Sequence, residues 1–190
     1  MGDSITDGWD DPKYGGFFPG KPYVDRGISG QTTPQMLIRF RPDVIASAPE
    51  RGGHSRRVPT DIAGNTGPMT LEAIEDNLTS MSAACAGRAG SGWCWLRFCP
   101  SAITLRPGKV SRLFAVCRDL LNRSQALNEW MKKYAAATGA VYLDYYSAMV
   151  DEHGFLKDEL SDDGLHPNQK GYDLMAPLAE RAIAAVLKKN

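Results

Sequence analysis

The sequence lacks long apolar runs, and it has no excess of charge of either sign. Its 190 residues include 22 Lys and Arg against 22 Asp and Glu. It contains neither the roughly 20 apolar residues of a membrane span nor the shorter apolar core of a secretory signal, so it predicts a soluble protein. The balanced charge offers no basic face for nucleic acid. Membranes and nucleic acids are therefore not the expected partners.

The four cysteines also lack a pattern. Cys85, Cys94, Cys99 and Cys117 show neither the close paired spacing of a zinc site nor a CxxC redox motif. They predict no metal site and no disulfide. A chain of this length, 43% hydrophobic, suffices for one compact domain over residues 1–190, because no repeat or linker marks a boundary.

Apolar residues recur at helical spacing in several stretches, some with a start or stop signal. Thr33 and Thr70 are expected N-caps, Pro42 should kink or shorten the first helix, and Gly139 should end the third. A short apolar strand is expected at 140–143. Helices that alternate with such strands indicate an α/β layered fold with parallel strands. The expected helices cover 33–44, 70–81, 124–138 and about 168–186.

Two distant segments contain the residue types of a nucleophile and its base. GDSITDGW at residues 2–9 carries Ser4, and DDGLHPN carries Asp163 and His166, three residues apart. A serine hydroxyl becomes a good nucleophile when a base takes its proton and a carboxylate orients that base. Taken singly, each motif fits a structural role better: Ser4 as a helix N-cap, and His166 as an exposed loop residue beside a capping Asp163.

A glycine-rich turn, RGISGQTT at residues 26–33, opens onto the first expected helix. The backbone N–H of Gly30 could face a developing oxyanion, because glycine lets the chain approach closely. Gly27 and Gly30 could equally serve only the turn. Together, a nucleophile, an oxyanion donor and a base–carboxylate pair are the parts that acyl transfer needs.

These motifs resemble the sequence blocks of the SGNH hydrolases, the GDSL esterase/lipase family. GDSIT is similar to the first block, ISGQT to the second and DGLHPN to the last, in the family's order. The resemblance implies a three-layer α/β/α fold with a parallel, flavodoxin-like sheet, and no metal or organic cofactor. It is strongest to the lysophospholipase L1-like and acetylhydrolase-like branch, whose members cleave short-chain esters or acetyl groups from carbohydrates.

The same resemblance implies a role for each matching residue. Ser4 is the nucleophile, His166 the general base and acid, and Asp163 the partner that orients His166. The backbone N–H groups of Ser4 and Gly30 are oxyanion donors. The chain would then be a serine esterase that hydrolyses short acyl or acetyl esters through an acyl-enzyme.

A further family block is altered in this sequence. The family has Gly-x-Asn-Asp after an apolar strand, and the Asn side chain is the third oxyanion donor. Here the block reads Val58-Pro59-Thr60-Asp61 and follows GGHSRR. Thr60 stands at the Asn position, so its shorter hydroxyl is the expected donor. The loss of one oxyanion donor costs on the order of 10²- to 10³-fold in rate.

The genetic code offers an explanation for the altered block. Permitted codons for residues 53–58, read from the second base, give Val-Ile-Leu-Ala-Gly. The other shifted frame, applied to residues 92–100, gives Val-Val-Leu-Ala-Ser-Val-Leu-Pro. Both read as buried strands and fall where the family has strands. We therefore expect residues near 50–60 and 83–104 to be an out-of-frame translation bounded by compensating insertions or deletions, with natural divergence into loops as the rival.

The start of the chain departs from the family as well. Members place an apolar strand immediately before the GDS motif, whereas here Ser4 follows Met1 by three residues. We expect a truncated start or a fragment, and a signal peptide could have been lost with it. The compartment therefore stays open, as does the oligomeric state.

Alternatives remain for the function and for the nucleophile. An acyltransferase would use the same acyl-enzyme and pass the acyl group to an alcohol. If residues 50–60 are real, a catalytically impaired protein that binds a saccharide or another ligand is favoured. Ser29 and Ser161 are alternative nucleophiles. His54 and His153 are expected in the altered segment and in a solvated turn.

Overall fold

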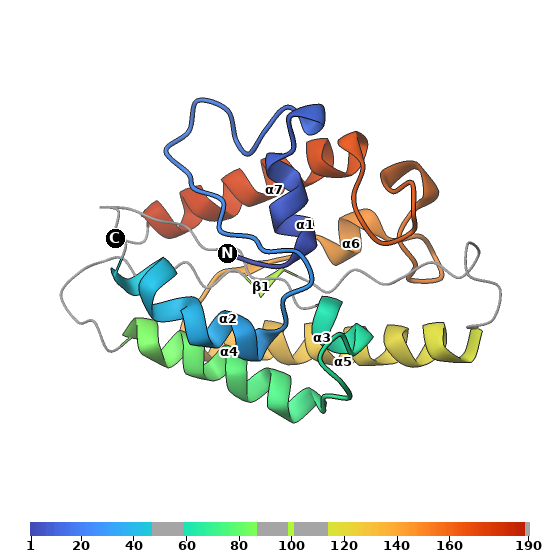
Figure 1. Cartoon of the computed structure of the whole chain (residues 1–190), viewed down its shortest axis with the longest axis horizontal. Helices are drawn as coiled ribbons and strands as arrows, with labels where there is room; N and C mark the ends of the chain where they lie inside the picture. Colours follow the sequence, from blue (N-terminus) through green and yellow to red (C-terminus); the bar gives the residue numbers. More distant parts are fainter. Residues whose placement is uncertain (47–58, 87–98, 101–113, 189–190) are drawn as a thin grey trace.

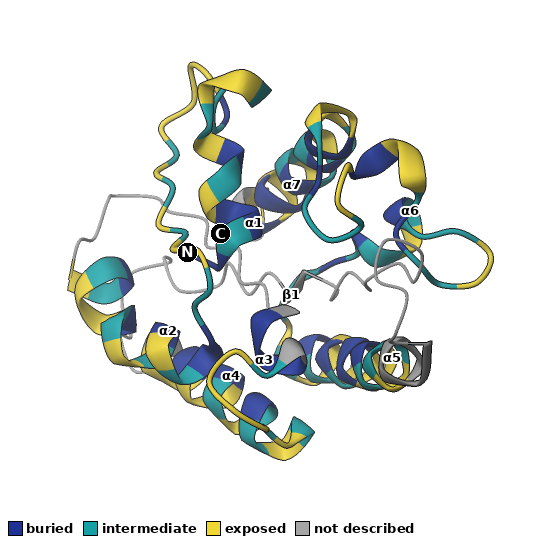
Figure 2. Ribbon diagram, turned by 45° about the vertical axis from the view of Figure 1, so that its right-hand side comes forward, coloured by how far each residue is buried: buried dark blue, intermediate teal, exposed yellow. Residues whose placement is uncertain are grey.

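The computed structural model describes residues 1–46, 59–86, 99–100 and 114–188. Within these ranges, helices lie on both sides of a thin central layer of strands (Figures 1 and 2). One side carries α1 (Ser4–Asp7), α6 (Tyr146–Met149) and α7 (Gln169–Lys188). The other carries α2 (Thr33–Phe40), α3 (Pro59–Ala63), α4 (Leu71–Ala86) and α5 (Phe114–Thr138). Shorter helical turns are η1 (Gly8–Asp10), η2 (Pro12–Tyr14), η3 (Arg41–Ala46) and η4 (Asp158–Leu160).

The central layer consists of short parallel pairings. Strands β1 (Cys99–Pro100) and β2 (Tyr142–Leu143) run parallel, and β2 lies within the predicted strand 140–143. A separate parallel bridge joins Gly2 to Gly27. β1 contains the last two residues of the stretch whose shifted reading frame gives a strand. The rest of that stretch, and almost all of 50–60, lie outside the described residues.

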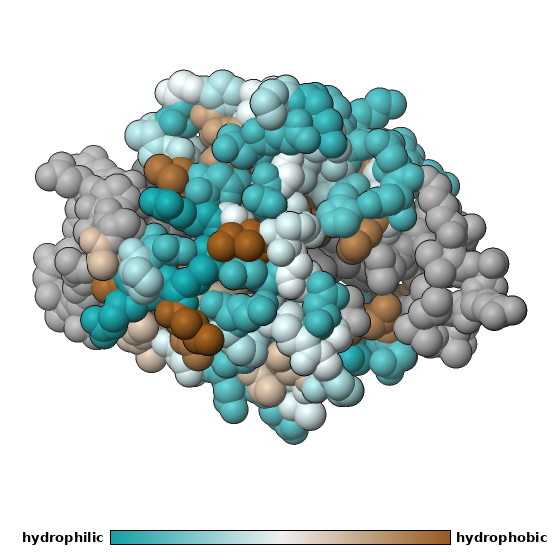
Figure 3. All heavy atoms as spheres, viewed as in Figure 1, coloured by the Kyte–Doolittle hydropathy of each residue, from teal (hydrophilic) through white to brown (hydrophobic). Residues whose placement is uncertain are grey.

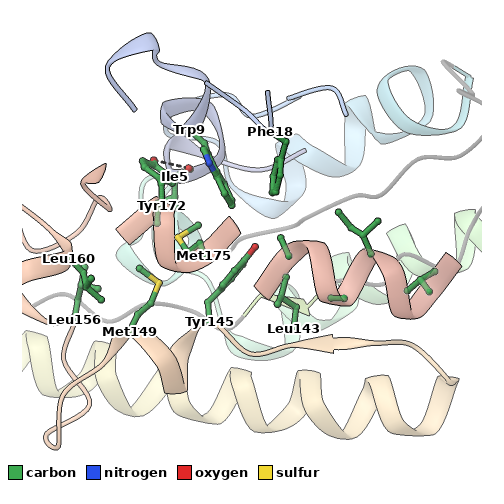
Figure 4. Close-up of a cluster of buried hydrophobic side chains, with 14 residues drawn as sticks. Ile5, Trp9, Phe18, Leu143, Tyr145, Met149, Leu156, Leu160, Tyr172 and Met175 are labelled. Carbon is green, nitrogen blue, oxygen red and sulfur yellow. Dashed lines mark hydrogen bonds between the residues drawn. The ribbon is translucent and has the colours of Figure 1, made fainter. Parts of the chain in front are cut away.

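Two hydrophobic clusters hold the helices in place. The first packs α7 against α1, β2 and α6 (Figure 4), and the second packs α2, α3, α4 and α5 around Met1. Within the first cluster, the Tyr172 hydroxyl on α7 donates a hydrogen bond of 3.0 Å to the carbonyl of Ile5 on α1. This bond is buried, so α1 and α7 are joined by a polar contact as well as by apolar packing.

All four predicted helices are present, with shifted ends. α4 begins after Thr70, whose hydroxyl accepts a hydrogen bond from the Ala73 N–H, and α5 ends before Gly139, which has a left-handed φ of 69°. Two starts were predicted wrongly. α5 begins at Phe114 rather than at 124, and Phe114, Cys117 and Leu121 already recur at helical spacing in its first turns. The N-cap of α2 is Thr32 and not Thr33, because the Gln35 side chain accepts from the Thr32 N–H while Thr33 pairs elsewhere.

The predicted effect of Pro42 is confirmed. α2 stops at Phe40, and the chain continues as the wider π-helical turn η3, which contains Pro42 near its start. A proline inside a helix lacks the N–H that an α-helical hydrogen bond requires, which favours such a change. None of the described helices combines the length and the apolar character that crossing a membrane requires.

Candidate active site

Ser4, His166 and Asp163 form a continuous hydrogen-bonded series. The Ser4 Oγ lies 2.9 Å from the His166 Nε2, and the His166 Nδ1 lies 2.6 Å from the Asp163 Oδ2. A carboxylate only accepts hydrogen bonds, so the proton is on Nδ1 and Nε2 accepts from the serine hydroxyl. The series therefore has the polarity that a nucleophile, a base and an orienting carboxylate require.

The loop before α7 fixes Asp163 through its second carboxylate oxygen. Asp163 Oδ1 accepts hydrogen bonds from the backbone N–H groups of Leu165 and His166 and from the Ser161 hydroxyl. Partial burial alone would raise the pKa of Asp163, but these bonds and the one from the His166 ring outweigh it and hold the pKa below its usual range. Asp163 is therefore ionised at neutral pH.

Ser4 is the first residue of α1, directly after its cap. The Asp3 side chain accepts a hydrogen bond of 3.0 Å from the Ile5 N–H, which fixes the first turn of this short helix. The cap is therefore Asp3, and the N-cap role that sequence alone allows for Ser4 is not what the structure shows. Ser4 is half-buried and its hydroxyl is directed to His166.

The glycine-rich turn packs tightly against α1. The Ile28 N–H donates to the Gly2 carbonyl at 3.0 Å. A side chain on Gly27 would lie within 2.8 Å of the Asp7 Cα and the Thr6 carbonyl carbon, so this position has no room for one. Gly27 is therefore required by the close approach of the turn to the segment that carries Ser4.

Gly30 has a different requirement. The Gln31 N–H donates to the Ile28 carbonyl at 3.3 Å, and Gly30 has a left-handed φ of 78° at the third position of that turn. A turn with a positive φ at this position favours glycine, whose missing Cβ removes the steric cost. The structure therefore shows a structural role in the turn for both glycines, and the Ile28–Gly2 hydrogen bond joins this turn to the segment before Ser4.

Thr60 lies on α3, with its hydroxyl already engaged. The Thr60 Oγ1 donates to the Gln31 carbonyl, one residue after Gly30. Thr60 is buried. The sequence-predicted oxyanion position is thus brought close to the glycine turn, but its single hydroxyl proton is used in a bond to the backbone.

Asp61 is a buried residue that sequence reasoning passed over. Its carboxylate accepts from the Thr33 N–H at 2.8 Å and from the Thr33 hydroxyl at 2.7 Å, which ties α3 to the first turn of α2. Burial raises the pKa of Asp61 to about 6, against the hydrogen bonds from Thr33, and the nearby Asp3 adds to the rise. The signal available in the sequence was its place as the last residue of the altered Val58–Asp61 block.

Arg39 was also missed, and nothing in the sequence pattern indicates its role. From α2, its guanidinium donates to the Gly2 carbonyl at 3.3 Å and to the Arg26 carbonyl at 2.9 Å. It also pairs with Asp43 at 2.6 Å. Arg39 therefore connects the segment before Ser4 with the start of the glycine turn.

The other serine and histidine candidates do not take part in the Ser4–His166–Asp163 series as nucleophile or base. The Ser161 hydroxyl donates to Asp163 and accepts from the Gly164 N–H, so it serves the loop. Ser29 is exposed. His153 lies in an exposed turn beside Glu152, as predicted, and His54 lies outside the described residues. Among the described residues, no three His, Cys, Asp or Glu side chains gather in a way that could hold a metal ion.

Comparison with protein families assigns the chain. The model of the GDSL-like Lipase/Acylhydrolase family matches residues 1–174. The chain belongs to this family. Ester hydrolysis is therefore its general class of activity, and the match spans both segments that supply the Ser4–His166–Asp163 series.

Solved structures agree with this assignment. A GDSL-like lipase from Bacteroides thetaiotaomicron is 31% identical with a TM-score of 0.77, over 97% of this chain and 86% of that one. A candidate acylhydrolase from Bacteroides fragilis is 30% identical with a TM-score of 0.82, over 98% and 86%. An acetylxylan esterase variant from Geobacillus stearothermophilus is 19% identical with a TM-score of 0.69, over 96% and 91%, which shows the fold alone. No curated protein sequence matches the chain.

These matches confirm the expected fold class. The GDSL relatives have the SGNH hydrolase fold, and this chain has helices on both faces of a parallel strand layer. The described part of the chain is mostly helical, with only short strands, which agrees with an SGNH fold whose strands are degraded.

Proposed function

We propose that this GDSL protein is a serine esterase that hydrolyses short acyl or acetyl esters through an acyl-enzyme. The observation that supports it most is the series Ser4–His166–Asp163. The Ser4 Oγ and the His166 Nε2 lie 2.9 Å apart although the two residues are 162 positions apart in the chain, and Asp163 is 2.6 Å from the other ring nitrogen. A helix cap or a solvated loop would not need this pairing. A capping residue at Ser4 and an exposed loop residue at His166 are each common, but these two roles do not explain why the two side chains meet.

In the proposed reaction, the Ser4 Oγ attacks the acyl carbonyl carbon while the His166 Nε2 takes the hydroxyl proton. The tetrahedral intermediate collapses, the ester C–O bond breaks, and His166 returns that proton to the leaving alcohol. Water then attacks the acyl-enzyme with His166 again as the base. The acid is released and the Ser4 hydroxyl is restored. Throughout, Asp163 keeps the imidazole oriented and stabilises its charged form.

The proposed oxyanion donors are the backbone N–H groups of Ser4 and Gly30. Ser4 begins α1, and the first N–H groups of a helix have no partner within the helix. Gly30 lies in a turn that Arg39 and the Gly2–Gly27 bridge hold against the Ser4 segment. The role of Thr60 as a third donor stays a prediction. Its hydroxyl would have to break its hydrogen bond to the Gln31 carbonyl before it could donate to the oxyanion.

A small acyl group is proposed because the described part of the site is open. The side chains of His166 and Asp163 keep 40% and 55% of their exposed area. On the face drawn in Figure 3, hydrophobic residues form separate spots within a mainly hydrophilic surface. Such a surface favours a small ester over a lipid aggregate, whose binding would profit from a continuous apolar patch.

The test is hydrolysis of p-nitrophenyl esters from acetate to decanoate by the wild-type chain and by Ser4→Ala. We expect Ser4→Ala to lose essentially all enzymatic turnover, and the wild type to prefer acetate. Ser29→Ala is the matched control and should keep full activity, because it removes an exposed serine of the glycine-rich turn. Equal rates for wild type and Ser4→Ala would overturn the proposal. A preference for decanoate would overturn the short-chain part only.

A further inference from the structure

We infer that the buried hydroxyl of Tyr172 is a positioning group, which keeps the α1 segment that carries Ser4 in register with the loop that carries His166. This inference rests on the proposed esterase function and adds a residue to it. Tyr172 lies in the first turn of α7, and its hydroxyl donates to the carbonyl of Ile5, the residue after Ser4, at 3.0 Å. Figure 4 shows this bond between α7 and α1.

The helix that carries Ser4 needs support from outside. α1 is four residues long, and a single helical turn is not stable by itself. The Asp3 side chain accepts from the Ile5 N–H at 3.0 Å, and Tyr172 donates to the Ile5 carbonyl. Ile5 is itself buried, so both its backbone groups and its side chain are fixed. The placement of Ser4 therefore follows from the contacts of the residue beside it.

Tyr172 and His166 belong to one tightly packed segment. The Tyr172 N–H donates to the Asn168 carbonyl at 3.0 Å, and the Asn168 Oδ1 accepts from the Gly171 N–H at 3.2 Å. A Cβ on Gly171 would lie 2.8 Å from the Cβ of Pro167, so the first turn of α7 packs directly against the residue that follows His166. The Tyr172 ring thus extends from the same segment that places the base.

Two hydrogen bonds then join this segment to α1. One is the 2.9 Å contact between the Ser4 Oγ and the His166 Nε2, and the other is the bond from Tyr172 to Ile5. The first is lost in the proposed acyl-enzyme, because an esterified Oγ has no proton to donate. The second contains no reacting atom and is kept. Tyr172 therefore keeps His166 beside the acyl group while His166 activates water.

Packing alone does not require the Tyr172 hydroxyl. The ring centroid lies 5.2 Å from that of Trp9 and 5.0 Å from that of Tyr14, and the residue is only 2% exposed. A phenylalanine would make the same ring contacts. Apolar packing is non-directional, whereas a hydrogen bond needs its acceptor at a set distance and angle. The hydroxyl therefore fixes how α1 lies along α7, which the ring contacts leave less well defined.

The experiment compares Tyr172→Phe with the wild type in p-nitrophenyl acetate hydrolysis, well below the Tm of both and alongside Ser4→Ala. We expect kcat to fall about 10- to 10²-fold with KM nearly unchanged, because a displacement of roughly 1 Å can cost 10²-fold in rate. Tyr146→Phe is the matched control. Its hydroxyl also donates to a backbone carbonyl, that of Gly154 at 3.3 Å, but this bond does not involve α1. Tyr146→Phe should keep the wild-type kcat.

Phosphorylation of Ser4 by diethyl p-nitrophenyl phosphate gives a readout that a purely structural role would not move. The Ser4 Oγ forms a bond to phosphorus, p-nitrophenolate leaves, and His166 takes the hydroxyl proton. The rate constant reports the alignment of Ser4 with His166, and the amount of p-nitrophenolate reports how many chains are folded. Tyr172→Phe should release one equivalent per chain, as the wild type does, with a rate constant lowered by about 10- to 10²-fold.

The outcomes separate this inference from the proposed function. If Ser4→Ala abolishes turnover and Tyr172→Phe keeps the wild-type kcat, the inference is overturned and the esterase proposal stands. A Tyr172→Phe variant that releases less than one equivalent at the wild-type rate constant has fewer folded chains, which assigns the hydroxyl to stability and overturns the inference too. An equal loss of kcat in Tyr146→Phe would have the same meaning. If wild-type turnover does not depend on Ser4, both proposals fall.

Discussion

At the residue scale, the two oxygens of Asp163 have separate tasks. Oδ1 receives the hydrogen bonds that shape the loop, and Oδ2 receives the His166 Nδ1–H. An asparagine at this position could keep its oxygen toward the loop. Its amide group would then face the imidazole and donate to it, which favours the tautomer with the proton on Nε2. That tautomer cannot accept the Ser4 proton.

We therefore predict that Asp163→Asn loses activity while the fold is kept. A fall in kcat of about 10³- to 10⁴-fold is expected, the size known for a wrongly set tautomer in a serine triad. Asp162→Asn is the control, because it changes the neighbouring carboxylate yet keeps an oxygen for Asn168. Steady-state kinetics and circular dichroism of both variants check the prediction. An Asp163→Asn variant with near-normal kcat would contradict the role of Asp163.

Asp61 gives the stability of the chain a predictable pH dependence. Its pKa is raised from 3.8 to about 6 by burial, so between these values the folded chain binds more protons than the unfolded chain. The contribution of Asp61 to stability is therefore fully present below pH 4 and is lost as the pH rises to 6. Relative to Asp61→Asn, the wild type should lose up to about 3 kcal/mol over this range.

Urea unfolding of both proteins at pH 4, 5, 6 and 7 measures this difference. Subtracting the two series removes the contributions of the other carboxylates, which titrate in both proteins. The wild-type curve should descend relative to that of Asp61→Asn from pH 4 to 6 and then run parallel to it. Parallel curves over the whole range would show that the pKa of Asp61 is not raised.

At the scale of elements, the site depends on how closely the glycine turn meets α1. A Cβ at Gly27 would press on the backbone of Thr6 and Asp7, which cannot move aside as a side-chain tip could. We predict that Gly27→Ala lowers the free energy of unfolding by about 1–3 kcal/mol. Its rate of ester hydrolysis should fall by a larger fraction than its stability. Chemical denaturation and ester hydrolysis measure the two effects. Full activity in Gly27→Ala would mean that the turn does not position the site.

Arg39 is the second link between these elements. We predict that Arg39→Met lowers stability by about 1–3 kcal/mol, because two backbone carbonyls and Asp43 lose a charged donor. Activity should fall through kcat, since the Ser4 segment and the glycine turn would no longer be held together. Arg41→Met, an exposed arginine at the next turn, should change neither quantity. Thermal melting and kinetics of both variants are the measurements.

Features that depend on neighbouring residues could be predicted from the sequence, whereas features that depend on contacts between distant segments could not. Helix α4 and the main part of α7 have apolar stripes, and local caps mark the start of α4 and the end of α5, so their helices were predicted. The hydrogen bonds between Thr33 and Asp61 join separate segments, as do those from Arg39 to the carbonyls of Gly2 and Arg26, and neither contact leaves a local sequence pattern. The Ser4, Asp163 and His166 candidates were found because their motifs are short and specific. The hydrogen bond that occupies Thr60 depends on a contact with Gln31 that only the fold creates.

At the scale of the whole molecule, the altered reading frame stays a prediction. We expect independent sequencing of the encoding DNA to reveal compensating insertions or deletions around residues 50–60 and 83–104. An unbroken, error-free frame together with an intact mass equal to that of this sequence would contradict a sequencing error. A protein translated from a true frame shift would pass that test, and it should then unfold at low denaturant because apolar strand sequence has been replaced.

The separation of Ser4 and His166 by 162 residues also has a consequence in time. Ribosomes add roughly 5–20 residues per second, so Ser4, the proposed nucleophile, exists for on the order of ten seconds before His166, its proposed base, has been synthesised. During that interval the growing chain carries a serine with an ordinary hydroxyl, chemically inert toward esters. In the proposed mechanism, ester hydrolysis thus begins only when the last part of the chain folds back onto the first, and a nascent or prematurely ended chain cannot carry it out.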